Sequence, residues 1–230
     1  MTIRKLILVS LFFLSSPLFA DTIAIIGTGN VGMALGTEFA RQGHTIVYGS
    51  RSPLGLKALD LAKKTDGNSS TAVPADAAAG AQIIVLAVPG MVVEEVVQQL
   101  GDLSGKLIID ATNPLVMDEP MHFTFGVKSS NGEIVQAAAP EAMVVKAFNT
   151  ITWQSMIDPG DSDGPLYVPI VGNDRSAKEK VAKMVAKMGL ESIDLGPIGV
   201  AHWTEYSVVV ALNNELSERA NFDLVFREID

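Results

Sequence analysis

A glycine-rich turn between two apolar segments constrains this chain more than any other feature of its sequence. Residues 22–26 read as a buried strand, and a helix pattern resumes after the turn. In the turn, the first glycine permits a sharp bend, the second lets a pyrophosphate approach the backbone, and the third lets the helix pack close to the strand. The helix start adds unpaired N–H groups and the positive end of its dipole. We therefore predict a dinucleotide site formed by Gly27, Thr28, Gly29, Asn30, Val31 and Gly32.

The end of the next predicted strand, residues 45–48, indicates which dinucleotide binds. Proteins that prefer NAD carry an acidic residue here, which holds the free ribose 2′-hydroxyl. This chain has Ser50 in that place, followed by Arg51, and a hydroxyl beside a guanidinium suits the 2′-phosphate of NADP. Lys57, on the following predicted helix, could also reach the phosphate. The alternative is a surface serine with solvated basic side chains. The sequence favours NADP(H).

Three further apolar strands end in short turns that contain proline, asparagine or threonine. The carboxyl ends of parallel strands share one edge of a sheet, where open α/β folds bind their ligands. We therefore expect these turns to border the nicotinamide. The residues predicted to do so are Val88, Pro89, Asn113, Pro114, Phe148, Asn149 and Thr150. Asp110, which closes one of these strands, reads as a cap for a neighbouring loop rather than as a catalytic acid.

Composition excludes several classes of function. The chain has 230 residues, 48% of them hydrophobic, which suits a sheet buried on both faces. Its net charge of −9 argues against a nucleic-acid partner, because such proteins need a positive surface. There is no cysteine, and the three histidines, His44, His122 and His202, are scattered, so no metal site is predicted.

Residues 1–20 have the layout of a secretory signal. Arg4 and Lys5 precede an apolar run, Leu6 to Leu14, and a short segment that ends in Ala20 follows this run. We expect export to the periplasm after cleavage at Ala20, with no stable membrane insertion of the mature chain. A cytoplasmic or membrane-anchored protein is the alternative.

The mature chain is predicted to be α/β, a doubly wound parallel sheet with a small carboxyl-terminal α/β extension. We place an NADP-binding domain at residues 21–165 and a strand–helix extension at residues 166–230. Residues 117–132 show no regular periodicity, so we expect them to be irregular, either as a flap over the site or as a surface excursion.

Five segments together resemble the deazaflavin-dependent NADP oxidoreductase family, which includes the cytosolic domain of the six-transmembrane metalloreductases. The segments are Gly27 to Gly32, Gly49 to Arg51, Val145 to Thr150, Val171 to Asp174 and Asp194 to Pro197. The resemblance implies a Rossmann-like domain whose small carboxyl-terminal part closes the pocket of the second substrate. It also implies hydride transfer between NADP(H) and a deazaflavin (coenzyme F420) or flavin.

Residues 198–205 depart from the family pattern, which commonly has a small residue and an arginine after Gly-Pro-Leu, so the second substrate stays open. Hydride transfer requires two rings held face to face more than an acid or base, so we assign no catalytic residue. His202 and Trp203 are candidates for contact with the second ring. The alternatives are that His202 is bonded to the backbone and that Trp203 lies in the core. The alternative functions are a non-catalytic NADP-binding sensor or partner subunit, and an imine or β-hydroxy acid reductase. A homodimer is compatible with the sequence.

Overall fold

A computed structural model describes residues 20–65, 68–120, 122–160, 166–217, 224 and 226. The predicted signal peptide lies outside the described residues, apart from Ala20. Eight strands form one sheet in the order β10-β9-β8-β5-β4-β1-β2-β3. Their bounds are β1 (Thr22–Ile26), β2 (Thr45–Gly49), β3 (Ser69–Ala72), β4 (Ile83–Leu86), β5 (Leu107–Asp110), β8 (Met143–Lys146), β9 (Tyr167–Gly172) and β10 (Glu191–Gly196). The strands from β3 to β8 in this order are parallel, whereas β9 is antiparallel to β8 and parallel to β10.

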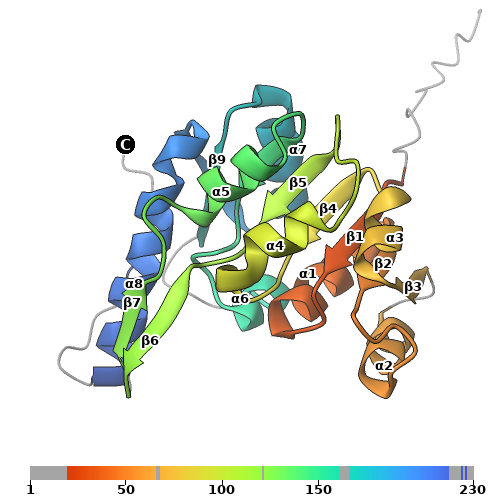
Figure 1. The fold of residues 1–230 in the computed structure, drawn as a ribbon, viewed down its shortest axis with the longest axis horizontal. Coiled ribbons are helices and arrows are strands. Elements are labelled where there is room, and N and C mark those ends of the chain that lie inside the picture. Colours follow the sequence, from red (N-terminus) through yellow and green to blue (C-terminus); the bar gives the residue numbers. More distant parts are fainter. Residues whose placement is uncertain are drawn as a thin grey trace, which may run out of the picture.

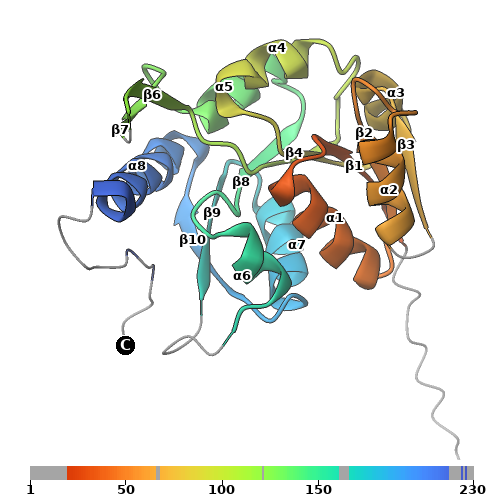
Figure 2. The same cartoon turned by 90° about the horizontal axis from the view of Figure 1, so that it is seen from below.

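Helices cover both faces of this sheet, as Figures 1 and 2 show. The helices are α1 (Asn30–Arg41), α2 (Leu56–Lys64), α3 (Pro74–Ala79), α4 (Val93–Gln98), α5 (Asn131–Ala138), α6 (Trp153–Ile157), α7 (Arg175–Ala186) and α8 (Ala201–Ser217), with short 3₁₀ turns η1 (Gly90–Val92) and η2 (Ile198–Val200). The side chains of β1 alternate between the two faces of the sheet. Ile23 and Ile25 enter the core beneath α1 and α7, and Ala24 and Ile26 enter the core beneath α3 and α4. The α/β doubly wound fold class is confirmed.

The carboxyl-terminal segment continues this sheet. Strands β9 and β10 extend it beyond β8, and α7 packs against both strands. Helix α8 then leaves the sheet and packs against α5 and a separate hairpin. Among the described residues, no helix has the length and hydropathy needed to span a membrane.

The segment that we expected to be irregular contains a hairpin of β6 (Leu115–Glu119) and β7 (His122–Phe125). This hairpin packs on α8, where the Phe125 and Tyr206 rings stack with centroids 4.0 Å apart. The Asn213 side chain also accepts a hydrogen bond from the backbone nitrogen of Phe123 at 2.6 Å and donates one to its carbonyl oxygen at 2.7 Å. Local periodicity did not reveal the hairpin because its partner lies about 90 residues further along the chain.

Candidate functional site

The glycine turn between β1 and α1 packs closely at two of its glycines. Gly27 has a φ of 120°, and a Cβ atom there would lie 2.3 Å from the carbonyl oxygen of Ala87. A Cβ atom at Gly32 would lie 2.2 Å from the carbonyl oxygen of Gly27. Only glycine fits at both positions, which brings α1 against the end of β1 as the sequence predicts.

Gly29 has a different environment from the other two glycines. A Cβ atom at Gly29 would meet nothing within 4 Å. Gly29 is also the N-cap of α1, where no side chain caps the helix and no acidic residue stands in the first turn. The N–H groups at this helix start therefore have no side-chain cap, and the open space at Gly29 lets an anion approach them.

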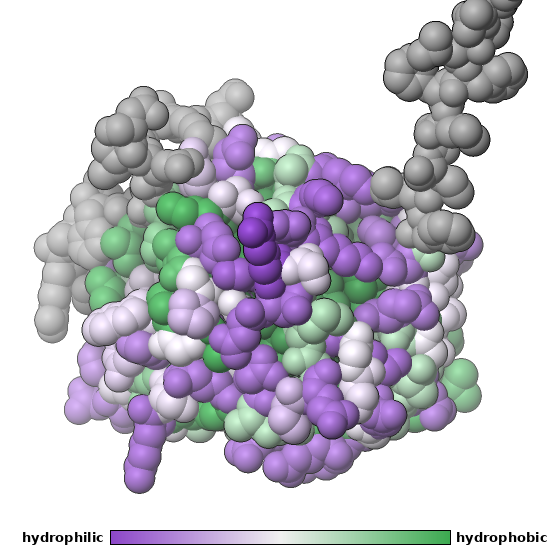
Figure 3. Space-filling view, turned by 90° about the horizontal axis from the view of Figure 1, so that it is seen from above, coloured by the Kyte–Doolittle hydropathy of each residue, from purple (hydrophilic) through white to green (hydrophobic). Residues whose placement is uncertain are grey.

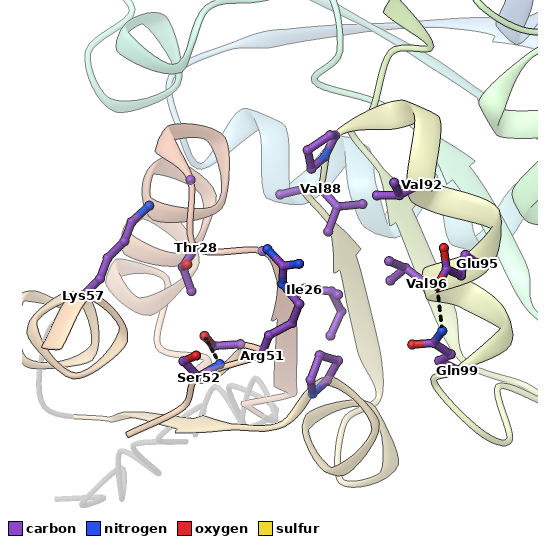
Figure 4. A pocket seen from close by; sticks show the side chains of 17 residues that line it. Ile26, Thr28, Arg51, Ser52, Lys57, Val88, Val92, Glu95, Val96 and Gln99 are labelled. Atoms are coloured by element: carbon purple, nitrogen blue, oxygen red, sulfur yellow. Dashed lines mark hydrogen bonds between the residues drawn. The ribbon is translucent and has the colours of Figure 1, made fainter. Parts of the chain in front are cut away.

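A cavity with a volume of about 670 Å³ lies over this turn. Eight of the predicted cofactor-binding residues line it, namely Gly27, Thr28, Gly29, Ser50, Arg51, Lys57, Val88 and Pro89. Figure 4 shows Lys57 on one side, Val96 and Gln99 on the other, and Arg51 between them. The volume falls within the range of small-molecule sites.

The two basic side chains of this cavity are Arg51, in the turn after β2, and Lys57, in the first turn of α2. The Oγ atom of Ser50 accepts a hydrogen bond from the backbone nitrogen of Ser52 at 3.1 Å, which fixes the turn. Arg51 and Lys57 are exposed, and neither forms an ion pair with another described residue. Both cations are therefore available to a phosphate.

One wall of the cavity was missed at the sequence level. Glu95 and Val96 of α4 line it together with Gln99, the C-cap of this helix, and the Gln99 amide donates to the Glu95 carboxylate at 3.1 Å. None of the predicted site residues lies on this helix. Its position directly after β4, whose end borders the site, was the signal that could have identified this wall.

The remaining predicted residues do not line this cavity. Asn30 and Val31 begin α1. At the ends of β5 and β8, the Asn113 amide donates to the main-chain oxygen of Asn149 at 2.9 Å, and the Asn149 amide donates to Oδ1 of Asn113 at 3.0 Å. Pro114 is buried next to this pair.

Phe148 contributes through its backbone. Its φ of 66° is the one left-handed φ among the described non-glycine residues, and its ring packs edge-on against Phe39 in the core. The chain therefore turns sharply out of β8 toward the pair of asparagines.

Just beyond this turn, Oδ1 of Asn149 and Oγ1 of Thr150 are buried and have no hydrogen-bond partner among the described groups. Such atoms are rare in folded proteins and are available to a ligand.

A buried ionic cluster beneath these turns was also missed. The Lys146 ammonium lies 2.9 Å from Oδ2 of Asp110 and 2.7 Å from Oε1 of Glu205, and all three side chains are fully buried. Asp110 also accepts hydrogen bonds from the backbone nitrogen and the hydroxyl of Thr112, which confirms its role as a loop cap. Burial raises the pKa of the Glu205 carboxyl, and Lys146 opposes this shift.

The two candidate second-ring contacts lie at the start of α8. Nδ1 of His202 is 2.8 Å from the carbonyl oxygen of Gly199, as the backbone-bonded reading predicts. Trp203 is 66% exposed, so the core reading of this residue is wrong. Among the described residues, no group of three or more His, Asp or Glu side chains could hold a metal ion.

A mostly parallel sheet with a glycine turn, an uncapped helix start and a cavity above them defines a dinucleotide-binding protein of the Rossmann type. The sequence pattern of the family "NADP oxidoreductase coenzyme F420-dependent" matches residues 22–114. A crystal structure from Arthrobacter sp. FB24, provisionally described as an F420-dependent NADP-reductase, is 32% identical with a TM-score of 0.80, covering 86% of this chain and 95% of that one. The chain belongs to the F420-dependent NADP oxidoreductase family.

Two curated relatives show the breadth of this family. The F420-dependent NADP reductase of Methanothermobacter thermautotrophicus is 28% identical, over 86% of this chain and 90% of that protein. Metalloreductase STEAP3 of Rattus norvegicus is 29% identical over 82% of this chain. The chain spans only 36% of the length of that metalloreductase.

Proposed function

We propose that this protein is an NADP(H)-dependent oxidoreductase that transfers a hydride between the nicotinamide and a deazaflavin, flavin or similar redox ring. The observation that carries the proposal is the open space above Gly29, where the cavity meets the uncapped start of α1. A side chain at this position would fill the place that a pyrophosphate needs. The residues present therefore fit a dinucleotide.

The adenosine half of the cofactor is proposed to lie toward β2 and α4. Ser50 and Arg51 would hold the ribose 2′-phosphate, with Lys57 as a third group near it. Bonds between charged partners are the stronger class of hydrogen bond. Because both basic side chains are exposed, they would contribute less at high salt.

The nicotinamide half is proposed to lie over the ends of β4, β5 and β8. This follows from the strand order, since a cofactor whose pyrophosphate sits at β1 and whose adenosine sits at β2 must extend toward β4. The unpartnered oxygen atoms of Asn149 and Thr150 lie at that end and would accept hydrogen bonds from a carboxamide. NADPH, when bound, supplies the hydride.

The second ring is proposed to bind where the β6–β7 hairpin and the start of α8 approach the turn after β4. A Cβ atom at Gly126, just after β7, would lie 2.5 Å from the sulfur of Met91 in η1, so this end of the hairpin lies against that turn. The nearby side chains include Met91, Val116 and the stacked rings of Phe125 and Tyr206. The protein would keep water away from the ring and hold it flat, which is what hydride transfer requires.

The test of this function is NADPH consumption against a panel of flavins, a deazaflavin, ferric chelates and imines. We expect oxidation with one or more of the flavin-like rings and little or none with the imines. Tight NADPH binding without oxidation by any acceptor would favour the non-catalytic sensor instead.

We also propose that the protein is exported, because residues 1–20 have the composition of a signal peptide. The mature amino terminus would then be Asp21. Amino-terminal sequencing of the protein from its host checks this, and recovery of an intact Met1 from the cytoplasm would contradict it.

A further inference from the structure

The cluster of Asp110, Lys146 and Glu205 carries more negative than positive charge. Two carboxylates surround one ammonium, and all three side chains are fully buried. Glu205 accepts hydrogen bonds from the backbone nitrogens of Asn131 at 2.9 Å and Gly132 at 3.1 Å in addition to its contact with Lys146. Each of these partners is a donor, so Glu205 is bound as a carboxylate.

The surroundings offset only part of this charge. The two backbone donors belong to the start of α5, whose dipole supplies about half a positive charge. Glu133, in the first turn of the same helix, adds a negative charge. The cluster therefore keeps a net negative charge in a fully buried region, where a field reaches further than it does in solvent.

Hydrogen bonds connect the cluster to the turns proposed to border the nicotinamide. Lys146 donates to the carbonyl oxygen of Thr112, the residue before Asn113. The Asn131 amide donates to Thr112 Oγ1 at 2.8 Å and to the carbonyl oxygen of Gly90, the residue after Pro89, at 3.0 Å. Lys146 itself lies two residues before Phe148. The charge is thus placed directly beneath the ends of β4, β5 and β8.

We propose that the Asp110–Lys146–Glu205 cluster makes the site prefer the oxidised cofactor. The oxidised nicotinamide ring is positively charged and the reduced ring is neutral, so a fixed negative charge nearby strengthens binding of NADP⁺ relative to NADPH. This inference rests on the proposed function, because it requires the nicotinamide to lie at these turns. Its consequence is that NADPH bound to the protein is a stronger hydride donor than NADPH in solution, which favours catalysis in the direction of NADPH oxidation.

The experiment compares the dissociation constants of NADP⁺ and NADPH for the wild type and for Glu205→Gln. We expect the ratio of the NADP⁺ constant to the NADPH constant to rise about three- to tenfold in the variant, as the loss of one nearby charge predicts. A tenfold rise corresponds to about 30 mV in the two-electron potential of the bound couple. Both nucleotides bind the same folded protein, so a general loosening of the pocket cancels in the ratio.

Glu215→Gln is the matched control, because it removes the same charge from an exposed position on the same helix. We expect it to leave the ratio unchanged. Asp110→Asn removes the other carboxylate and should shift the ratio in the same direction as Glu205→Gln, which provides a second test if one variant folds poorly. An unchanged ratio in either folded variant overturns the inference. A wild type that binds neither nucleotide would instead refute the proposed function.

Discussion

Asn113 and Asn149 form a reciprocal pair across the ends of β5 and β8, each amide donating to the other residue at 2.9 and 3.0 Å. The pair joins two neighbouring strands at the edge where the cofactor is proposed to lie. It leaves Oδ1 of Asn149 buried without a hydrogen-bond partner among the described groups. An unsatisfied buried acceptor costs roughly 1–3 kcal/mol, and a bound carboxamide would remove that cost.

Replacing Asn149 with alanine should therefore weaken cofactor binding. We expect NADPH affinity to fall about tenfold, which corresponds to the loss of a hydrogen bond of roughly 1.4 kcal/mol. Asn113→Ala is the matched control, because it breaks the same pair but keeps the Asn149 oxygen. Titration of NADPH and thermal melting of both variants distinguish binding from stability. Equal losses of affinity would show that the Asn149 oxygen does not contact the cofactor.

Two glycines of the phosphate turn should respond differently to valine. Gly29→Val places its side chain in open space, so the protein should fold normally while NADPH affinity falls by at least an order of magnitude. Gly32→Val forces a Cβ atom to 2.2 Å from the Gly27 oxygen and should destabilise the fold by about 3 kcal/mol or more. Melting temperature and dissociation constant, measured together, check both. A Gly29→Val protein that binds NADPH as the wild type does would remove this turn from the site.

Arg51 should determine the preference for NADPH over NADH. A charge-assisted hydrogen bond contributes roughly 1.5–3 kcal/mol, so Arg51→Ala should lower NADPH affinity about tenfold or more at low salt, and less at high salt. NADH affinity should not change, because NADH lacks the phosphate. Arg175→Ala removes an exposed arginine on α7 and serves as the control for net charge. Equal affinities for NADH and NADPH in the wild type would contradict this assignment.

His44 should make folding stability depend on pH. Burial lowers the pKa of its imidazole, with Asp21 partly opposing the shift, and Nδ1 accepts a hydrogen bond from the backbone nitrogen of Asp21 at 3.2 Å. The folded state therefore holds the neutral ring, and this contribution is present above about pH 6.5 and lost as the pH falls through the lower folded pKa. The melting temperature should drop over this window more steeply in the wild type than in His44→Gln. Identical slopes in the two proteins would show that His44 is not responsible.

The features that could be predicted from the sequence are those that depend on residues close together in the chain. The bounds predicted for β1 match those observed, and the roles predicted for Gly27 and Gly32 follow from contacts within a few residues or with one neighbouring strand. The hairpin and the Glu205 contacts depend on α8, which is distant in the sequence, so no local pattern indicates them. One signal was available, since Asp110 and Lys146 each stand as a charged residue in an otherwise apolar predicted strand; the structure pairs them in register.

The central claim is that a hydride passes directly from NADPH to a redox ring, and the most direct measurement follows that hydrogen. NADPH deuterated at C4 of the nicotinamide, in each stereochemical form, is incubated with the protein and a 5-deazaflavin, whose C5 retains the transferred hydrogen. The account predicts that one of the two forms gives reduced deazaflavin carrying one deuterium, in an amount equal to the NADPH oxidised. NADPH that binds but leaves the deazaflavin unlabelled with both forms would contradict the account.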